Sequence, residues 1–119
     1  IEEKNQPFEL CPSGIIGLET SLALGITSLV KENHLSLMSL LEKMTINPAK
    51  LYNLNRGYIE EGALADILIF DENEQWQVKD FDSNSSNSPF IGEKLYGKDI
   101  SCICGEPRIY FNESSIFRK

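Results

Sequence analysis

The spacing of apolar residues changes once along this chain, near Asn55, and this change limits the folds that the chain can adopt. Upstream of Asn55, apolar residues recur every three or four positions, which predicts amphipathic helices. Downstream, the segment from Ala65 to Asp71 is almost continuously apolar between acidic residues, which predicts a buried strand. A helical half followed by a strand half indicates an α+β arrangement.

The upstream half divides into three predicted helices. The first covers about 17–32. The second follows Ser36, which is a good N-cap residue, and continues to about Thr45. Asn47-Pro48 predicts a short third helix, with the asparagine as its cap and the proline at the first helical position, ending near Leu54.

The downstream half predicts further short strands. Their expected positions are Trp76 to Val78, Leu95-Tyr96, Ile100 to Cys104 and Arg108 to Phe111. Gly97 and Gly105-Glu106-Pro107 are expected to separate the last three strands. The Ser/Asn/Asp-rich stretch from Asp80 to Ser88 is expected to be a loop.

Several residues of this half have an expected structural role. The carboxylates of Asp66 and Asp71 flank the first strand, where they are expected to accept hydrogen bonds from turn amides. The aromatic side chains of Trp76, Phe81 and Phe90 are expected to fill the core under the long loop.

Composition narrows the class of protein. The 119 residues suffice for one domain and carry a net charge of −7, which argues against nucleic acid as a partner because phosphates need a basic surface. No apolar run approaches the roughly 20 residues that span a bilayer.

Among three cysteines, Cys102 and Cys104 are two positions apart and share one face of a predicted strand, but no second ligand pair has zinc-site spacing. A reduced, cytoplasmic protein without a membrane partner is the simplest interpretation.

The segment from Cys11 to Thr20 is a loop shaped by proline and glycine that leads into the first predicted helix. Glu19, in the first helical turn, suits the positive end of the helix dipole. The segment resembles the substrate loop of dihydroorotases, members of the amidohydrolase superfamily, whose usual pattern is A-P-F-G-I-x-G-x-E-T. In that family the segment follows the last metal- and proton-handling motif, so we expect this chain to be the C-terminal part of such an enzyme. Its first residue, Ile1, is not a methionine, which suggests a processed chain or a fragment.

Three further segments carry the same resemblance, in the order expected of the long-chain bacterial type. Asn47-Pro48-Ala49-Lys50-Leu51 resembles a helix start after the last barrel strand. The glycines and strand between Gly57 and Asp71 resemble the superfamily's return into its small β-sandwich. Asn87-Ser88-Pro89-Phe90-Ile91-Gly92 resembles the family's N-T-P-F-x-G segment.

The resemblance implies a fold and an activity. Residues 1–54 would be the last loop and outer helices of a (β/α)8 metal-dependent hydrolase barrel, and residues 55–119 would supply strands to the adjoining β-sandwich. The family is zinc-dependent, with a two-metal site, and interconverts N-carbamoyl-aspartate and dihydroorotate in pyrimidine biosynthesis. Implied partners are the remainder of the same enzyme and one of these small-molecule substrates, with a homodimer or aspartate carbamoyltransferase left open.

The resemblance also assigns residues. Ser13 and Gly14 match the two positions that contact the family's substrate, largely through the backbone. Backbone N–H groups ahead of a helix can bind an anion, and glycine permits close approach. This chain departs from the family pattern with Cys11 in place of alanine and Ser13 in place of phenylalanine, so an aromatic wall of the substrate pocket is lost. Taken without the resemblance, residues 12–14 also fit a plain structural turn.

Neither catalytic nor metal-binding residues of the family match this chain. It has a single histidine, His34, expected on the surface of a turn, whereas the family's site needs several histidines, a carboxylated lysine and an aspartate. We therefore expect residues 1–119 to be inactive alone. Two other interpretations remain: a non-catalytic homologue that is a structural partner of another pyrimidine-pathway enzyme, and an unrelated small α+β binding domain.

Overall fold

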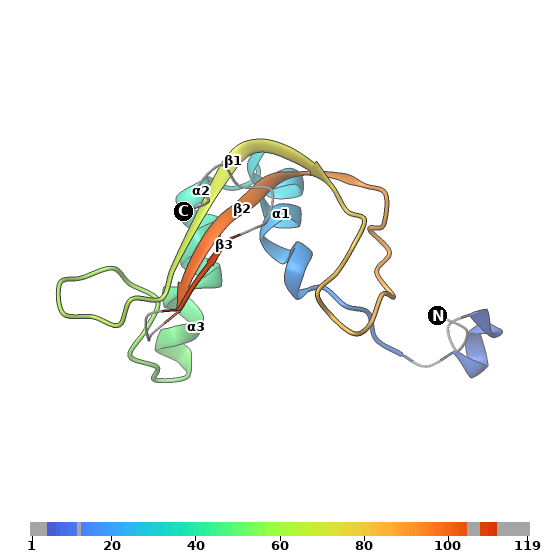
Figure 1. Ribbon diagram of the computed structural model, residues 1–119, viewed down its shortest axis with the longest axis horizontal. Coiled ribbons are helices and arrows are strands. Elements are labelled where there is room, and N and C mark those ends of the chain that lie inside the picture. The colour runs from blue at the N-terminus through green and yellow to red at the C-terminus, as the bar shows by residue number, and fades with distance from the viewer. Residues whose placement is uncertain (1–4, 12, 105–107, 112–119) are drawn as a thin grey trace.

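The computed structural model describes residues 5–11 and 13–104, together with the backbone of residues 108–111. Within these residues, short helices precede a three-stranded antiparallel sheet, and Figure 1 shows the sheet curving over the helices. The order of elements confirms the α+β arrangement. The expected break at Gly105-Glu106-Pro107 lies outside the described residues.

The first predicted helix is confirmed, although its geometry changes along its length. A 3-10 turn, η3 (Leu18–Thr20), leads into α1 (Ser21–Gly25) and then into a π-helical turn, η4 (Ile26–Val30). A separate short turn, η2 (Phe8–Leu10), precedes them. The N–H of Lys31 donates to the carbonyl of Ile26 at 2.9 Å, five residues back, as a π-helical turn requires.

The second helix confirms its predicted cap, whereas the third does not. The N–H of Ser39 donates to the Ser36 hydroxyl oxygen at 3.1 Å at the start of α2 (Leu37–Met44). Helix α3 (Ile46–Leu51) begins one residue before Asn47, so the predictions of Asn47 as its cap and of Pro48 at its first position were both wrong. Thr45 occupies the cap position, but its hydroxyl donates to the carbonyl of Leu41 at 2.7 Å and closes the preceding helix.

The predicted strands merge into longer ones. The structure has β1 (Ile67–Gln77), β2 (Lys94–Cys104) and β3 (Arg108–Phe111), paired in the order β1-β2-β3. Gly97 does not separate two strands, as the sequence predicted, but lies within β2 at a φ of +87°.

A bulge in β1 explains how β2 continues through this glycine. Asp71 pairs with Lys98 and Gln75 pairs with Tyr96, so three residues of β1 lie opposite Gly97 alone. The Asp71 carboxylate accepts hydrogen bonds from the N–H groups of Asn73 and Glu74 at 2.8 and 3.3 Å, which confirms its expected structural role. At the start of the strand, Asp66 forms an ion pair with Arg56.

The core lies between the first helix and the sheet. Ala23 packs with Val78 and Leu95, and these three residues are almost completely buried. Leu24, Trp76 and Phe81 are half-buried around them, which confirms the expected core position of Trp76 and Phe81. Phe90 is half-buried as well but does not belong to this cluster. The N–H of Tyr96 donates to the Thr27 hydroxyl oxygen at 2.8 Å and links the helix to β2.

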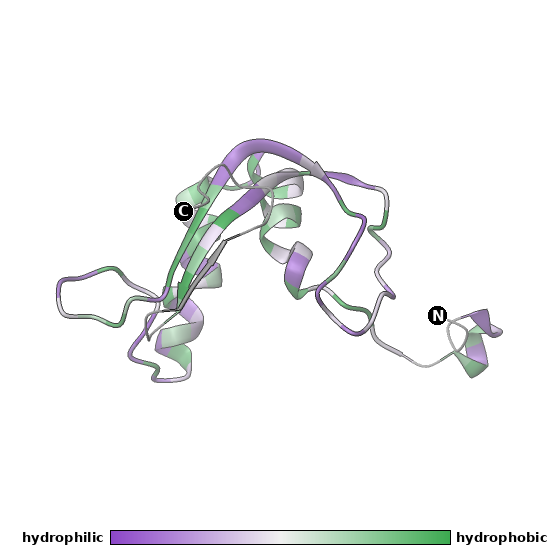
Figure 2. Ribbon diagram, viewed as in Figure 1, coloured by the Kyte–Doolittle hydropathy of each residue, from purple (hydrophilic) through white to green (hydrophobic). Residues whose placement is uncertain are grey.

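The first strand is less buried than its sequence predicts. Leu68 and Ile69 are 42% and 48% exposed. Figure 2 shows the hydrophobic start of β1, and part of it lines an open groove of about 1040 Å³ between the helices and the sheet. The prediction of a buried strand was wrong for Leu68 and Ile69, because the groove stays open over this end of the sheet. Ile67 and Phe70 at the same end are half-buried.

This groove leads to a prediction about residues 1–119 produced alone. The exposed apolar surface should cause self-association or binding of a hydrophobic fluorescent dye, because soluble monomers rarely expose large apolar patches. Light scattering and dye titration measure the two effects. A compact monomer that leaves dye fluorescence unchanged would contradict the prediction.

Candidate functional site

Residues 13–17 of the predicted substrate loop lie directly ahead of η3. Ser13 and Gly14 lie on this loop, and both are exposed. Gly14 has a φ of +93°, which a residue with a side chain rarely adopts, and no described atom lies within 4 Å of where its Cβ would be. Backbone conformation, and not crowding, therefore explains a glycine here. Pro12 of the same motif lies outside the described residues.

The loop contacts a second segment that is more than seventy positions away in the sequence. The side-chain amide of Asn87 donates to the carbonyl of Gly14 at 2.9 Å, and the N–H of Ile16 donates to the carbonyl of Asn87 at 3.4 Å. The fold thus brings together the two segments that most specifically resemble dihydroorotases. The sequence pattern includes Asn87 in its motif but assigns this residue no role.

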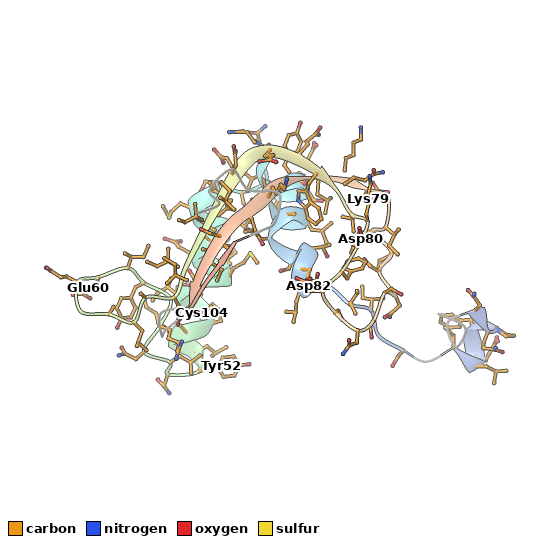
Figure 3. All side chains as sticks on the ribbon, in the orientation of Figure 1. Tyr52, Glu60, Lys79, Asp80, Asp82 and Cys104 are labelled. Atoms are coloured by element: carbon orange, nitrogen blue, oxygen red, sulfur yellow. The ribbon has the colours of Figure 1, made fainter. Side chains whose placement is uncertain are left out.

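A further contact joins the first helical turn to the same distant loop. The Glu19 carboxylate accepts hydrogen bonds from the N–H groups of Asp82 and Ser83 at 2.9 and 3.1 Å. Figure 3 shows Asp82 beside the start of α1. The sequence had indicated only a favourable position for Glu19 on the helix dipole, and no sequence signal identified its partners.

The other polar residues singled out in the sequence lie apart from this loop. His34 is exposed in the turn between η4 and α2, as expected. Cys102 and Cys104 share one face of β2, also as expected, with their Sγ atoms 3.4 Å apart. The hydrogen bond with Cys104, followed by burial, raises the pKa of the Cys102 thiol above its ordinary value of 9.0. This thiol therefore remains protonated at neutral pH and is a poor nucleophile.

A metal centre is not formed by the residues that the structure describes. Among them, no group of three or more His, Cys, Asp or Glu side chains is arranged to hold a metal ion.

Partial burial raises the pKa of the Asp99 carboxyl above its ordinary value of 3.8, although much of this residue remains exposed. The helices in the described ranges are all too short or too polar to cross a membrane.

Comparisons with known proteins agree with the resemblance seen in the sequence. The sequence profile of the amidohydrolase family matches residues 4–100. A dihydroorotase of Clostridioides difficile is 63% identical over 109 residues, which are 92% of this chain and 26% of that protein. A dihydroorotase of Lactococcus lactis is 52% identical over 110 residues, with the same two coverages.

The fold matches that of a solved hydrolase. A D-hydantoinase structure superposes with a TM-score of 0.80 at 23% sequence identity, over 96% of this chain and 25% of the hydantoinase chain. The chain thus spans about a quarter of the length of the proteins it matches. Since the family match extends over most of its residues, the chain belongs to the amidohydrolase family.

Proposed function

We propose that residues 1–119 are the C-terminal part of a dihydroorotase, an enzyme that interconverts N-carbamoyl-aspartate and dihydroorotate in pyrimidine biosynthesis. The observation that carries this proposal is the 63% identity to the dihydroorotase of Clostridioides difficile. The reaction closes and opens a cyclic amide, so the substrate presents carboxylate and amide groups to the protein. A cytoplasmic enzyme is part of the same proposal.

In the intact enzyme, this chain would lie at the end of a barrel. Residues 1–54 would form the last loop and outer helices of a (β/α)8 barrel, and residues 55–119 would form part of the small β-sandwich. The similarity to the D-hydantoinase fold supports this architecture, as does the change from helices to strands between Leu51 and Ile67. The apolar groove would pack against the remainder of the same enzyme.

Ser13 and Gly14 would form one wall of the substrate pocket. Both residues are exposed, which supports this role, because peptide N–H groups donate to carboxylate oxygens without needing a particular side chain. The loop position after the last strand also suits a barrel, whose active sites lie in the loops at the C-terminal ends of the strands.

The zinc that the resemblance implies does not fit the residues described here. No suitable cluster of ligands exists among them, and the proposal assigns no metal-dependent step to this chain. Any zinc ligands would come from the rest of the enzyme. Residues 1–119 alone should therefore be inactive.

A second candidate function is a non-catalytic dihydroorotase-like protein that supports another enzyme, such as aspartate carbamoyltransferase. Ser13, where the family usually has phenylalanine, favours this alternative because an aromatic wall of the pocket would be lost. Either protein could also form a homodimer.

An assay of the full-length protein tests the proposal. We expect it to open dihydroorotate and to form it from N-carbamoyl-aspartate, whereas residues 1–119 alone should give no turnover. Ultraviolet absorbance measures both reactions. A folded, metal-supplemented full-length protein that turns over neither compound would favour the structural role. Co-purification with aspartate carbamoyltransferase would then test that role directly.

A further inference from the structure

We propose that Asn87 and Glu19 are positioning residues that hold the substrate loop in its binding geometry. This inference rests on the proposed function, in which the backbone of Ser13 and Gly14 contacts substrate. Neither side chain needs to touch substrate. They act by fixing the segment 13–17 to the long loop 80–88, which crosses beside it.

Asn87 restrains Gly14, a residue of the substrate loop whose backbone is intrinsically flexible. Glycine has the widest backbone freedom of any residue, so an exposed glycine at positive φ is held in place only by its neighbours. The amide of Asn87 donates to the Gly14 carbonyl, and the carbonyl of Asn87 accepts from the Ile16 N–H. One residue thus fixes two peptide groups on either side of Ile15.

Glu19 anchors the opposite end of the long loop. Its two carboxylate oxygens accept from two consecutive N–H groups, those of Asp82 and Ser83, in charge-assisted hydrogen bonds. Glu19 itself is fixed in the helical turn that follows the substrate loop. The long loop is therefore attached at Glu19 and again at Gly14, and it spans the substrate loop between these two points.

The base of the long loop is closed independently of these contacts. The N–H of Val78 donates to the carbonyl of Glu93 at 2.9 Å, and the N–H of Gly92 donates to the carbonyl of Val78 at 2.7 Å. Because neither bond involves Asn87 or Glu19, replacing these residues should release the substrate loop without unfolding the sheet. Release of the substrate loop and unfolding of the sheet can therefore be distinguished by experiment.

The test uses Asn87→Ala in the full-length enzyme, with Asn84→Ala as the matched control. Asn84 lies in the same loop, is exposed, and makes no side-chain hydrogen bond within the described residues. We expect Asn87→Ala to raise KM for dihydroorotate about tenfold while kcat changes less than about twofold. The reason is that the loop would bind the substrate and the transition state less tightly by the same amount. Asn87→Asp should behave like Asn87→Ala, since it keeps the shape but removes the donor. Asn84→Ala should match the wild type.

Amide hydrogen exchange of residues 13–17 in the same proteins gives a readout that does not depend on turnover. Faster exchange in Asn87→Ala and Glu19→Ala, with wild-type exchange in Asn84→Ala, supports the positioning role. Unchanged exchange and unchanged KM in both variants overturn it, while wild-type activity leaves the proposed function standing. If the wild-type enzyme is inactive, the proposed function fails, and the exchange result alone decides whether these residues hold the loop.

Discussion

Replacing Gly14 by alanine in the full-length protein is expected to lower kcat/KM for dihydroorotate by about tenfold or more. Gly14 has a φ of +93°, and an L-residue pays about 1–2 kcal/mol to hold a left-handed conformation. We expect the loop to relieve this strain by turning its peptide groups away from the substrate, and each 1.36 kcal/mol lost from the transition state lowers the rate about tenfold. Steady-state kinetics of the purified variant measure the effect.

Two substitutions at Ser13 provide the matched controls. If substrate is bound through the backbone, Ser13→Ala should change kcat/KM by less than about twofold, since no side-chain contact is lost. Ser13→Phe restores the usual family residue and should lower KM if the missing aromatic wall weakens packing. A fully active Gly14→Ala variant beside an impaired Ser13→Ala variant would show that the side chain, and not the backbone, carries the contact.

Much of the fold could be predicted from local patterns. Ser36 caps α2 as its sequence position indicates, because capping depends on residues only three positions apart. The merging of short strands could not be predicted in this way. Gly97 has the sequence signature of a strand end, but its positive φ is accommodated by a bulge in β1, a partner more than twenty positions away. The burial of β1 was overestimated for a related reason: how deeply a strand is buried depends on distant segments that cover it, and not on the sequence of the strand itself.

The candidate site could be predicted only in part. The motifs around Ser13 and Asn87 pointed to the same family, but no periodicity relates positions so distant in sequence. Their contact depends on the packing of α1 against β2, which sets where the long loop crosses. Glu19 illustrates the same limit. Its position in a first helical turn could be predicted from the sequence, whereas its two amide partners belong to the long loop, more than sixty positions away.

The largest effect on stability is expected at Gly97, where the side chain of Ile26 packs against the backbone of β2. A Cβ at this position would lie 2.5 Å from the Cδ1 of the fully buried Ile26. Gly97→Ala combines this overlap with an unfavourable φ, and should lower the free energy of unfolding of the full-length protein by roughly 3 kcal/mol. Denaturant unfolding followed by circular dichroism measures the change.

Gly92 and Ile26 allow the two causes to be separated. Gly92 has a nearly identical φ of +88° with no described atom within 4 Å of where its Cβ would lie, so Gly92→Ala should cost only the backbone strain, about 1–2 kcal/mol. Ile26→Val removes the overlapping Cδ1 at a cost of about 0.5–1.5 kcal/mol. In the double variant Ile26→Val/Gly97→Ala, the relief of overlap should make the total loss smaller than the sum of the single losses by about 1 kcal/mol. Strict additivity, or equal losses for the two glycine variants, would show that the close approach of Ile26 to β2 does not limit this position.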